Sequence, residues 1–218
     1  GVPISIDTRN ATVAAACLAA GAAMVNDISG LANSAMLHVI ADTGAAATIM
    51  HMKGTPASMA TEAHYDDVLA EIREYLLAQA AKAVAAGAQT VIIDPGLGFA
   101  KGTQHNLHIL AHLDAFTDLG FPVLVGPSRK RFIGELTGAA PGDRVFGTIA
   151  AIVRCVEAGV AIVRVHDVAA ARQAITIAEA IEHAQRSLGA PDEHGECHGM
   201  QRAKQLLEQA EEAAAAAA

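Results

Sequence analysis

Six short segments place polar residues directly after runs of apolar, β-forming residues. In chain order they are SIDTR, NDISG, MHMKG, DPGLGF, GPSRK and RVHDV. Enzymes built as parallel barrels keep their chemistry at the C-terminal ends of their strands. The pattern therefore predicts one site, assembled from the residues that follow each strand.

Asp94 is the clearest candidate for recognising a ligand. It ends an apolar run and precedes Pro95 and Gly96, which predicts a carboxylate held at a sharp turn. A fixed carboxylate can pair bidentately with two adjacent N–H donors, such as the edge of an aminopyrimidinone ring. The alternative is a carboxylate that caps the next helix. Asp7 leaves the same two interpretations open, whereas the amide of Asn26 can both donate to and accept from a heterocycle.

Cations follow the last two predicted strands. Arg129, Lys130 and Arg131 are consecutive, and they form either a solvated surface or a run from which one cation points into the site. Arg164 and His166 share one face of an extended segment. With the helix that starts beside them they form a candidate anion site, where barrel enzymes commonly hold phosphate. The alternative is a surface ion pair and a histidine next to a helix cap.

Two apolar side chains near these segments, Met52 and Phe99, are candidates for the walls of a slot that takes a flat ring. His51 lies between two methionines, and we expect it to be a hydrogen-bonded structural residue rather than a ligand. The candidate site thus combines a carboxylate, an amide, cations and apolar walls.

A repeated strand–helix unit must position these residues. Each predicted strand precedes an Ala-rich stretch with helical periodicity, so the strands should be parallel and joined by crossover helices. The strongest helices are predicted over 66–86, with Gly87 just past the end, and over 168–185, capped by Asp167. The strands are predicted at 3–7, 24–28, 47–50, 90–94, 122–125 and 161–165.

The predicted fold class is an α/β barrel of the (β/α)₈ TIM type, with six of its eight strand–helix units (strands 3 to 8) visible. The absent pair would belong at the N-terminus. An open, doubly wound six-stranded sheet is the alternative, although no GxGxxG follows a strand. Residues 1–186 would form the barrel domain, and residues 187–218 a C-terminal appendage, polar first and then Ala/Glu-rich and helical.

Composition restricts the class of partner. The 218-residue chain is 52% hydrophobic and 17% charged, with a formal net charge of −8. This acidity disfavours nucleic acid or an anionic membrane and favours a small molecule. The sequence has neither an apolar run of membrane-spanning length nor a signal segment, and its three cysteines lack redox or metal-ligand spacing. We therefore expect a cytoplasmic protein.

In this order and at these spacings, SIDTR, NDISG, MHMKGTP with Met59, DPGLGFAK, GPSRKRFIG and RVHDV resemble the dihydropteroate synthase family of pterin-binding barrels. The resemblance extends from Ile4 to about Ala184. It implies a usually dimeric barrel that joins 6-hydroxymethyl-7,8-dihydropterin diphosphate to 4-aminobenzoate and releases diphosphate, with Mg²⁺ as a helper. That reaction is a step of folate synthesis and the target of sulfonamides.

The resemblance also implies roles for individual residues. Asp94 would hold the 2-amino and N3 edge of the pterin, Asn26 and Asp7 the other side of its ring system, and Lys130 its carbonyl and N5 edge. Arg164 would lie near the ring and bind the diphosphate together with His166. The implied catalytic residues are Lys130, Arg164 and His166; the implied substrate-binding residues are Asp7, Asn26, Met52, Asp94, Phe99, Gly126, Ser128, Lys130, Arg164, Val165 and His166, of which Phe99, Gly126 and Ser128 border the aminobenzoate.

The family pattern also contains two loops that this chain lacks. One, Asn-Val-Thr-Pro-Asp-Ser-Phe, supplies the Mg²⁺-ligating Asn, so no metal ligand is expected in this chain; the other is Gly-Glu-Ser-Thr-Arg-Pro. Two further functions therefore remain open. One is a non-catalytic pterin-binding remnant, and the other is a pterin-dependent methyltransferase domain, which would have no diphosphate for GPSRK and RVHDV to bind.

Overall fold

The computed structural model describes residues 1–189, with side chains to residue 186. Strands and helices alternate along most of this range, as predicted. The strands are β1 Ser5–Asp7, β2 Met24–Asp27, β3 Ala46–Met50, β4 Val91–Asp94, β5 Leu124–Val125 and β6 Ile162–Val163. The helices are α1 Ala11–Ala19, α2 Ser34–Thr43, α3 Val68–Ala85, α4 Thr103–Ala111, α5 Asp114–Thr117, α6 Arg131–Thr137, α7 Val145–Glu157 and α8 Val168–Gly189, with a 3₁₀ turn at Pro141–Asp143.

The strands are parallel and follow one another in sequence order. β1, β2, β3 and β4 pair in that order, β5 pairs with β6, and a bridge between Ile93 and Val123 links the two groups. A doubly wound sheet reverses its strand order at a switch point, whereas a barrel does not. The fold is therefore α/β of the TIM-barrel type, and the described residues hold the six predicted strands, each within a few residues of its predicted position.

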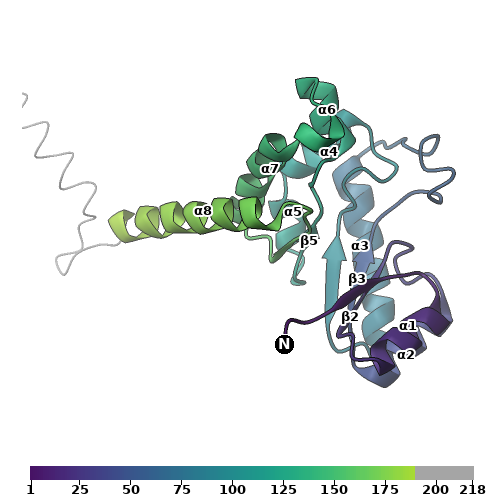
Figure 1. Cartoon of the computed structure of the whole chain (residues 1–218). Helices are drawn as coiled ribbons and strands as arrows, with labels where there is room; N and C mark the ends of the chain where they lie inside the picture. Colours follow the sequence, from purple (N-terminus) through teal and green to yellow (C-terminus); the bar gives the residue numbers. More distant parts are fainter. Residues whose placement is uncertain (190–218) are drawn as a thin grey trace, which may run out of the picture. The chain divides into compact units, whose positions relative to one another are not determined.

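Buried side chains on both faces explain why the central strands form. Val25, Ile49 and Ile93 are fully buried on one face of the sheet, and Thr48 and Met50 are fully buried on the other, as expected for a parallel sheet. Helix α3 turns one apolar stripe towards this sheet, with buried residues at Val68, Ile72, Leu76, Ala80 and Ala83. Each large aliphatic side chain buried in this way contributes about 1.5–3 kcal/mol. Figure 1 shows α1 and α2 side by side next to β1 and β2.

Local signals at helix ends are partly overridden by tertiary contacts. The Asp67 side chain caps α3 by accepting from the backbone N–H groups of Leu69 and Ala70, and Gly87 follows the helix with a φ of 102°. Asp167 precedes α8 as predicted, but its carboxylate binds Arg129 instead of the helix. Asp167 thus stands at the N-cap position, where its backbone carbonyl accepts the N–H of Ala171 at 3.0 Å, but its carboxylate forms charge-assisted bonds with an arginine.

The chain divides into two units, residues 1–174 and 175–218, and α8 crosses this division. All of the candidate site residues belong to the first unit. The predicted appendage, residues 187–218, lies outside the residues whose side chains are described. Within residues 1–189, no helix has the length and apolarity needed to cross a membrane.

Candidate functional site

A chain of hydrogen bonds links polar side chains from four strand ends. Asn26 donates from Nδ2 to Oδ2 of Asp7 at 2.8 Å. Arg164 donates from Nη1 to Oδ1 of Asn26 at 2.8 Å and from Nη2 to Oδ2 of Asp94 at 3.3 Å. The structure therefore brings together four of the five polar residues that the family resemblance assigned to the pterin. It also shows that Asp7 is no helix cap, because Asn10 caps α1.

Asp94 is held at the base of this arrangement. Its side chain is 1% exposed, and its Oδ1 accepts the backbone N–H of Gly96 at 2.7 Å. Gly96 has a φ of 71°, and a Cβ there would lie 2.0 Å from the carbonyl oxygen of His51, so only glycine fits the turn. Burial raises the pKa of Asp94, while the neighbouring Arg164 opposes the rise. Because α4 begins only at Thr103, the capping interpretation of Asp94 does not hold.

Lys130 is the cation of its run that turns inward. Its Nζ lies 4.5 Å from the centre of the Phe99 ring, and its pKa is lowered by burial, with Asp94 opposing. Arg129 instead forms two hydrogen bonds with Asp167, from Nε at 3.0 Å and from Nη2 at 2.6 Å. Arg131 is bound to Glu135 on the surface. A φ of 54° at Arg129 lets the chain present neighbouring side chains in different directions.

Ser128 and His166 form a pair held by two contacts. The Ser128 Oγ accepts the backbone N–H of His166 at 3.1 Å and lies 2.9 Å from its Nδ1. A hydroxyl oxygen can accept two hydrogens and donate one, so it can either accept from Nδ1 or donate to it. In the tautomer in which the hydroxyl donates to Nδ1, the ring hydrogen lies on Nε2, where it can donate to a ligand.

A cavity of about 240 Å³ contains most of the predicted site residues. Its lining is Asp7, Ile28, Phe99, Gly126, Ser128, Lys130, Arg164, Val165 and His166. Arg164 and His166, which were predicted to share one face, both line this cavity together with Val165. Asn26 lines an adjacent cavity of about 340 Å³ together with Asp7 and Arg164. Met52 and Asp94 are not among the residues that line these two cavities; Asp94 is connected to them through Arg164, and the role of Met52 as a wall stays a prediction.

A buried lysine that sequence reasoning missed lies behind the site. The Nζ of Lys101 donates to the carbonyl oxygens of His51, at 3.2 Å, and Phe99, at 2.9 Å, and lies 3.0 Å from His51 Nδ1. Burial lowers the pKa of Lys101 to about 7 and that of His51 to about 3. His51 is therefore a neutral, structural histidine, as predicted. The lysine closes the DPGLGFAK segment, and this position was the only sequence signal for it.

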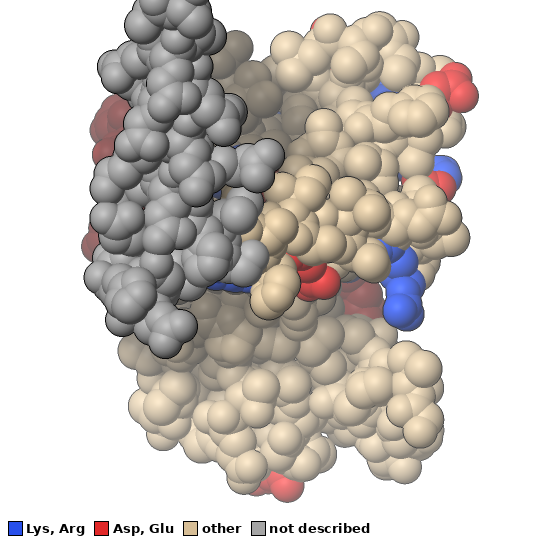
Figure 2. All heavy atoms as spheres, turned by 90° about the vertical axis from the view of Figure 1, so that its left-hand side faces the viewer, with Lys and Arg blue, Asp and Glu red and all other residues tan. Residues whose placement is uncertain are grey.

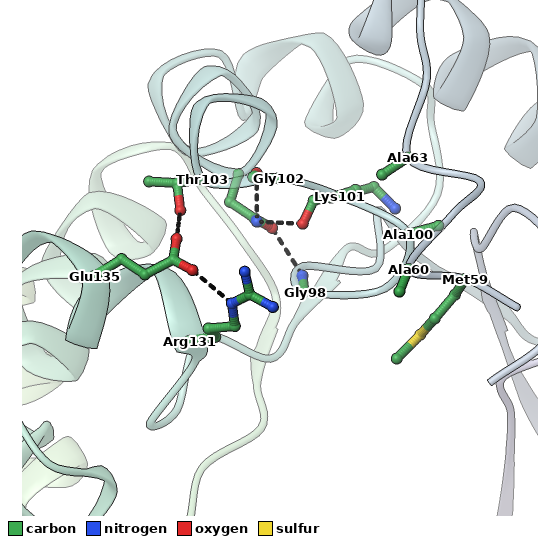
Figure 3. Close-up of a pocket in the computed structure, with 11 residues that line it drawn as sticks. Met59, Ala60, Ala63, Gly98, Ala100, Lys101, Gly102, Thr103, Arg131 and Glu135 are labelled. Carbon is green, nitrogen blue, oxygen red and sulfur yellow. Dashed lines mark hydrogen bonds and ion pairs between the residues drawn. The ribbon is translucent and has the colours of Figure 1, made fainter. Parts of the chain in front are cut away.

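Another cavity, of about 250 Å³, adjoins the site at Gly98. Figure 3 shows Arg131 and Glu135 of α6 on one side of it, and Met59 and Ala60 on the other. Glu135 accepts from the Thr103 hydroxyl and from Arg131 Nε. On the side of the first cavity, a Cβ at Gly98 would come within 3.0 Å of the Lys130 Cδ. Because residue 98 is a glycine, the Lys130 side chain can lie close to the backbone at this position.

The parallel, barrel-type fold, with a buried carboxylate and a group of cations after its strands, places this chain among barrel proteins that have a polar site at the C-terminal ends of their strands. The profile of the family described as "Pterin binding enzyme" matches residues 1–166. The chain belongs to this family.

Dihydropteroate synthases from two bacteria are among its relatives. That of Synechocystis sp. is 44% identical over 184 residues, which cover 83% of this chain and 64% of the relative. That of Neisseria meningitidis serogroup B is 42% identical over 191 residues, which cover 83% and 66%. The chain thus spans slightly less than two thirds of the length of these curated relatives.

Solved structures of dihydropteroate synthases are also similar to this chain. Dihydropteroate synthase of Thermus thermophilus in complex with 6HMPPP has 48% identity and a TM-score of 0.82, covering 84% of this chain and 73% of the other. The same enzyme in complex with 4-aminobenzoate has a TM-score of 0.81, with 83% and 71% covered.

Proposed function

We propose that this chain carries the pterin site of a dihydropteroate synthase, which joins 6-hydroxymethyl-7,8-dihydropterin diphosphate to 4-aminobenzoate in folate synthesis. The observation that carries the proposal is the buried carboxylate of Asp94 next to a cavity lined by Lys130, Arg164 and His166. A ligand with N–H donors at one end and a diphosphate at the other matches both parts. The relatives named above support the same activity.

The pterin would be recognised at its polar edges. Asp94 accepts from the 2-amino group and N3–H, and Asn26 contributes an amide that donates or accepts as the ring requires. Lys130 lies against the Phe99 ring with its Nζ available for the carbonyl and N5 edge. Asp7 fixes the orientation of the Asn26 amide through their hydrogen bond. Few other side-chain sets would bind both the donor and acceptor edges of such a ring.

Charge near the diphosphate would promote the reaction. The bond between the pterin methylene carbon and the diphosphate oxygen breaks, and its electron pair leaves with the diphosphate. The arylamine nitrogen then bonds to the methylene carbon, and its proton passes to the released diphosphate. The guanidinium of Arg164 and the Nε2–H of His166 are preorganised donors for the departing oxygens, and the N-terminus of α8 adds a favourable dipole.

The aminobenzoate would approach the methylene from the side of Phe99, Gly126 and Ser128. The cavity in Figure 3 offers room beyond Gly98, and Met59, Ala60 and Ala100 give it an apolar lining suited to a benzene ring. We therefore place the ring of the second substrate between Phe99 and this cavity. Sulfonamides should compete there with 4-aminobenzoate.

Mg²⁺ is proposed only as an ion that the diphosphate carries. Among the described residues, no group of three or more His, Cys, Asp or Glu side chains could hold a metal ion. No step is assigned to a resident Mg²⁺. Mg²⁺ commonly binds through substrate phosphates. Calorimetric titration of the pterin diphosphate into the protein, once with Mg²⁺ and once with EDTA in the buffer, should show a lower Kd with the ion.

A homodimer that functions in the cytoplasm is the assembly we propose. Large apolar side chains are exposed on α7 and α8, including Phe146 at 84%, Val168 at 57%, Ile177 at 61% and Ile181 at 55%. Among the atoms that Figure 2 does not draw in grey, most are tan, with separate Lys/Arg and Asp/Glu side chains between them. Exposed apolar surface favours association. Sedimentation velocity should give twice the 22.3 kDa chain mass, and a monomer at micromolar concentration would contradict the proposal.

The decisive test of function is turnover. The chain is incubated with the pterin diphosphate and labelled 4-aminobenzoate, and labelled dihydropteroate is separated and counted, with Asp94→Ala as the matched control. Product from the parent and none from the variant would support the synthase. Binding of the diphosphate without product would favour a non-catalytic pterin-binding protein. If diphosphate fails to compete with the pterin diphosphate, a pterin-dependent methyltransferase becomes the better description.

A further inference from the structure

The side chain of Arg164 bonds to both acceptors that the proposed function gives to the pterin. Its guanidinium extends from the end of β6 and reaches Asn26 Oδ1 on β2 with one terminal nitrogen and Asp94 Oδ2 on β4 with the other. The Asp94 side chain is 1% exposed, so these contacts cover the oxygen that a ligand would need. An internal group and the proposed ligand therefore compete for the same atoms.

The competition is close in chemical terms. A guanidinium consists of nitrogen donors on one carbon in a plane, with parallel N–H bonds suited to a carboxylate. The 2-amino and N3–H edge of a pterin is the same N–C–N arrangement, without the full positive charge. Asp94 Oδ1 already accepts the Gly96 N–H. Each carboxylate oxygen can accept two hydrogens, but Asp94 is 1% exposed and Arg164 lies on Oδ2, so a pterin reaches that oxygen only when the guanidinium moves away.

The surroundings give the displaced side chain somewhere to move. Arg164 is 37% exposed and lines the cavity that also contains Lys130, Ser128 and His166. The backbone at Gly126 lies beneath it, where a Cβ would be 3.3 Å from Nη2 and 3.4 Å from Nε. Because glycine leaves this space open, the guanidinium can turn within the cavity without a clash.

We propose that Arg164 is a specificity-determining residue, which makes the site select pterins that bear a diphosphate over pterins that lack one. The inference rests on the proposed function and deepens it. A pterin without phosphates must remove the guanidinium from two acceptors and leave it without replacement partners. A pterin diphosphate provides charged oxygens that receive the guanidinium, so the cost of displacement is offset.

The same competition acts on the product. When the diphosphate leaves, the pteroate product keeps the aminopyrimidinone edge but loses the group that held Arg164 away. The guanidinium can then return to Asn26 and Asp94 and compete with the product for them. Arg164 thus favours binding of the activated substrate and release of the product through one set of hydrogen bonds.

The test compares two ligands in three proteins. Calorimetry measures the Kd of 6-hydroxymethylpterin and of its diphosphate for the parent, for Arg164→Ala and for Arg154→Ala. Arg154 is the matched control because it lies on α7 and bonds to Glu157 and the Ala111 carbonyl. In Arg164→Ala the diphosphate should bind at least tenfold more weakly, whereas the alcohol should bind several-fold more tightly. Arg154→Ala should change neither affinity.

Opposite changes in the affinities for the two ligands distinguish a competing Arg164 from one that only binds the anion. If Arg164→Ala weakens both ligands, or leaves the alcohol unchanged, Arg164 is a ligand contact and not a competitor, and the inference is overturned. If that variant does not fold, Arg164→Lys replaces it: one ammonium cannot span both acceptors, so the alcohol should again bind more tightly than to the parent.

Failure of the proposed function gives a different result. A parent that binds neither pterin would overturn both the function and this inference. A parent that binds the diphosphate and forms dihydropteroate, with a ratio of the two Kd values unchanged in Arg164→Ala, would overturn the inference alone. The Kd ratio is the informative quantity, because a general loss of folded protein lowers the amount that binds either ligand and leaves the ratio unchanged.

Discussion

Replacing Asp94 by Asn should abolish tight pterin binding while preserving the shape of the side chain. In the proposed complex the carboxylate accepts two N–H groups, and hydrogen bonds to a charged group contribute about 1.5–3 kcal/mol each. The amide keeps one acceptor, worth about 1 kcal/mol, so the net loss is about 2–5 kcal/mol. That loss corresponds to a Kd increased by roughly 30-fold to several thousand-fold.

Stability should change in the other direction. Burial raises the pKa of Asp94 in the folded protein, so the ionised carboxylate is less favourable there than in the unfolded chain. The parent should therefore lose stability as pH rises through the folded-state pKa of Asp94, and Asp94→Asn should not. Urea unfolding at pH 7 should consequently give the variant an unfolding free energy at least equal to that of the parent.

Calorimetry with the pterin diphosphate measures the affinity, and Asp27→Asn is the matched control. Asp27 is a fully buried carboxylate on β2 that binds Ser29 through Oδ1. Because Asp27 bonds to Ser29 within its own turn, whereas Asp94 bonds to Arg164 of the site, Asp27→Asn should leave pterin affinity unchanged. If Asp94→Asn binds within about threefold of the parent, a difference below about 1 kcal/mol, Asp94 serves the turn at Gly96 and our assignment is refuted.

Three further predictions concern groups around the site. Burial lowers the pKa of Lys101 from 10.5 to about 7, so between these pH values the unfolded chain holds one more proton than the folded chain, and the unfolding free energy should rise with pH. Urea titrations at several pH values should find no such rise in Lys101→Met. An equal rise in that variant would show that Lys101 is not its cause. Arg129→Lys keeps the charge but only one of the two bonds to Asp167, which hold the segments of Lys130 and His166 together. Steady-state kinetics should therefore show KM for the pterin diphosphate raised several-fold with kcat nearly unchanged. A lower kcat alone would contradict this positioning role of Arg129. Ser128→Ala frees Nδ1 of His166 from its hydroxyl partner, so diphosphate affinity by calorimetry should fall about fivefold, or about 1 kcal/mol, and an unaltered Kd would exclude the pair from anion binding.

The strands and the contents of the site were predictable because both depend on short-range patterns. Apolar runs that end in a polar residue gave all six strands, and the C-terminal ends of parallel strands meet at one edge. This is why Asp7, Asn26 and Asp94, far apart in sequence, could be assigned to one site. The inward cation of GPSRK was also foreseeable, although the residue pattern alone did not identify it as Lys130.

Contacts between loops were not predictable from local patterns. Asp167 carries the signal of an N-cap, yet Arg129, 38 residues earlier, binds its carboxylate. Lys101 looks like an ordinary exposed lysine after a glycine-rich loop, and it is buried because two carbonyl groups and His51 surround its ammonium. In each case the deciding partner comes from another strand–helix unit, which only the assembled fold brings near.

Strand register explains why the acceptors of this site lie together and why a long side chain connects them. Asp7 pairs with Asn26, and through Thr48 the level of Asn26 corresponds to Ile92 on β4. Asp94 is two residues further along, so it shares the face of Asn26 but lies one step higher. Acceptors at different levels on β2 and β4 can be bridged from β6 only by a side chain that has reach and two separate donors. Arginine meets both needs. An aminopyrimidinone edge carries its donors on the same N–C–N arrangement, so it can pair with the same acceptors.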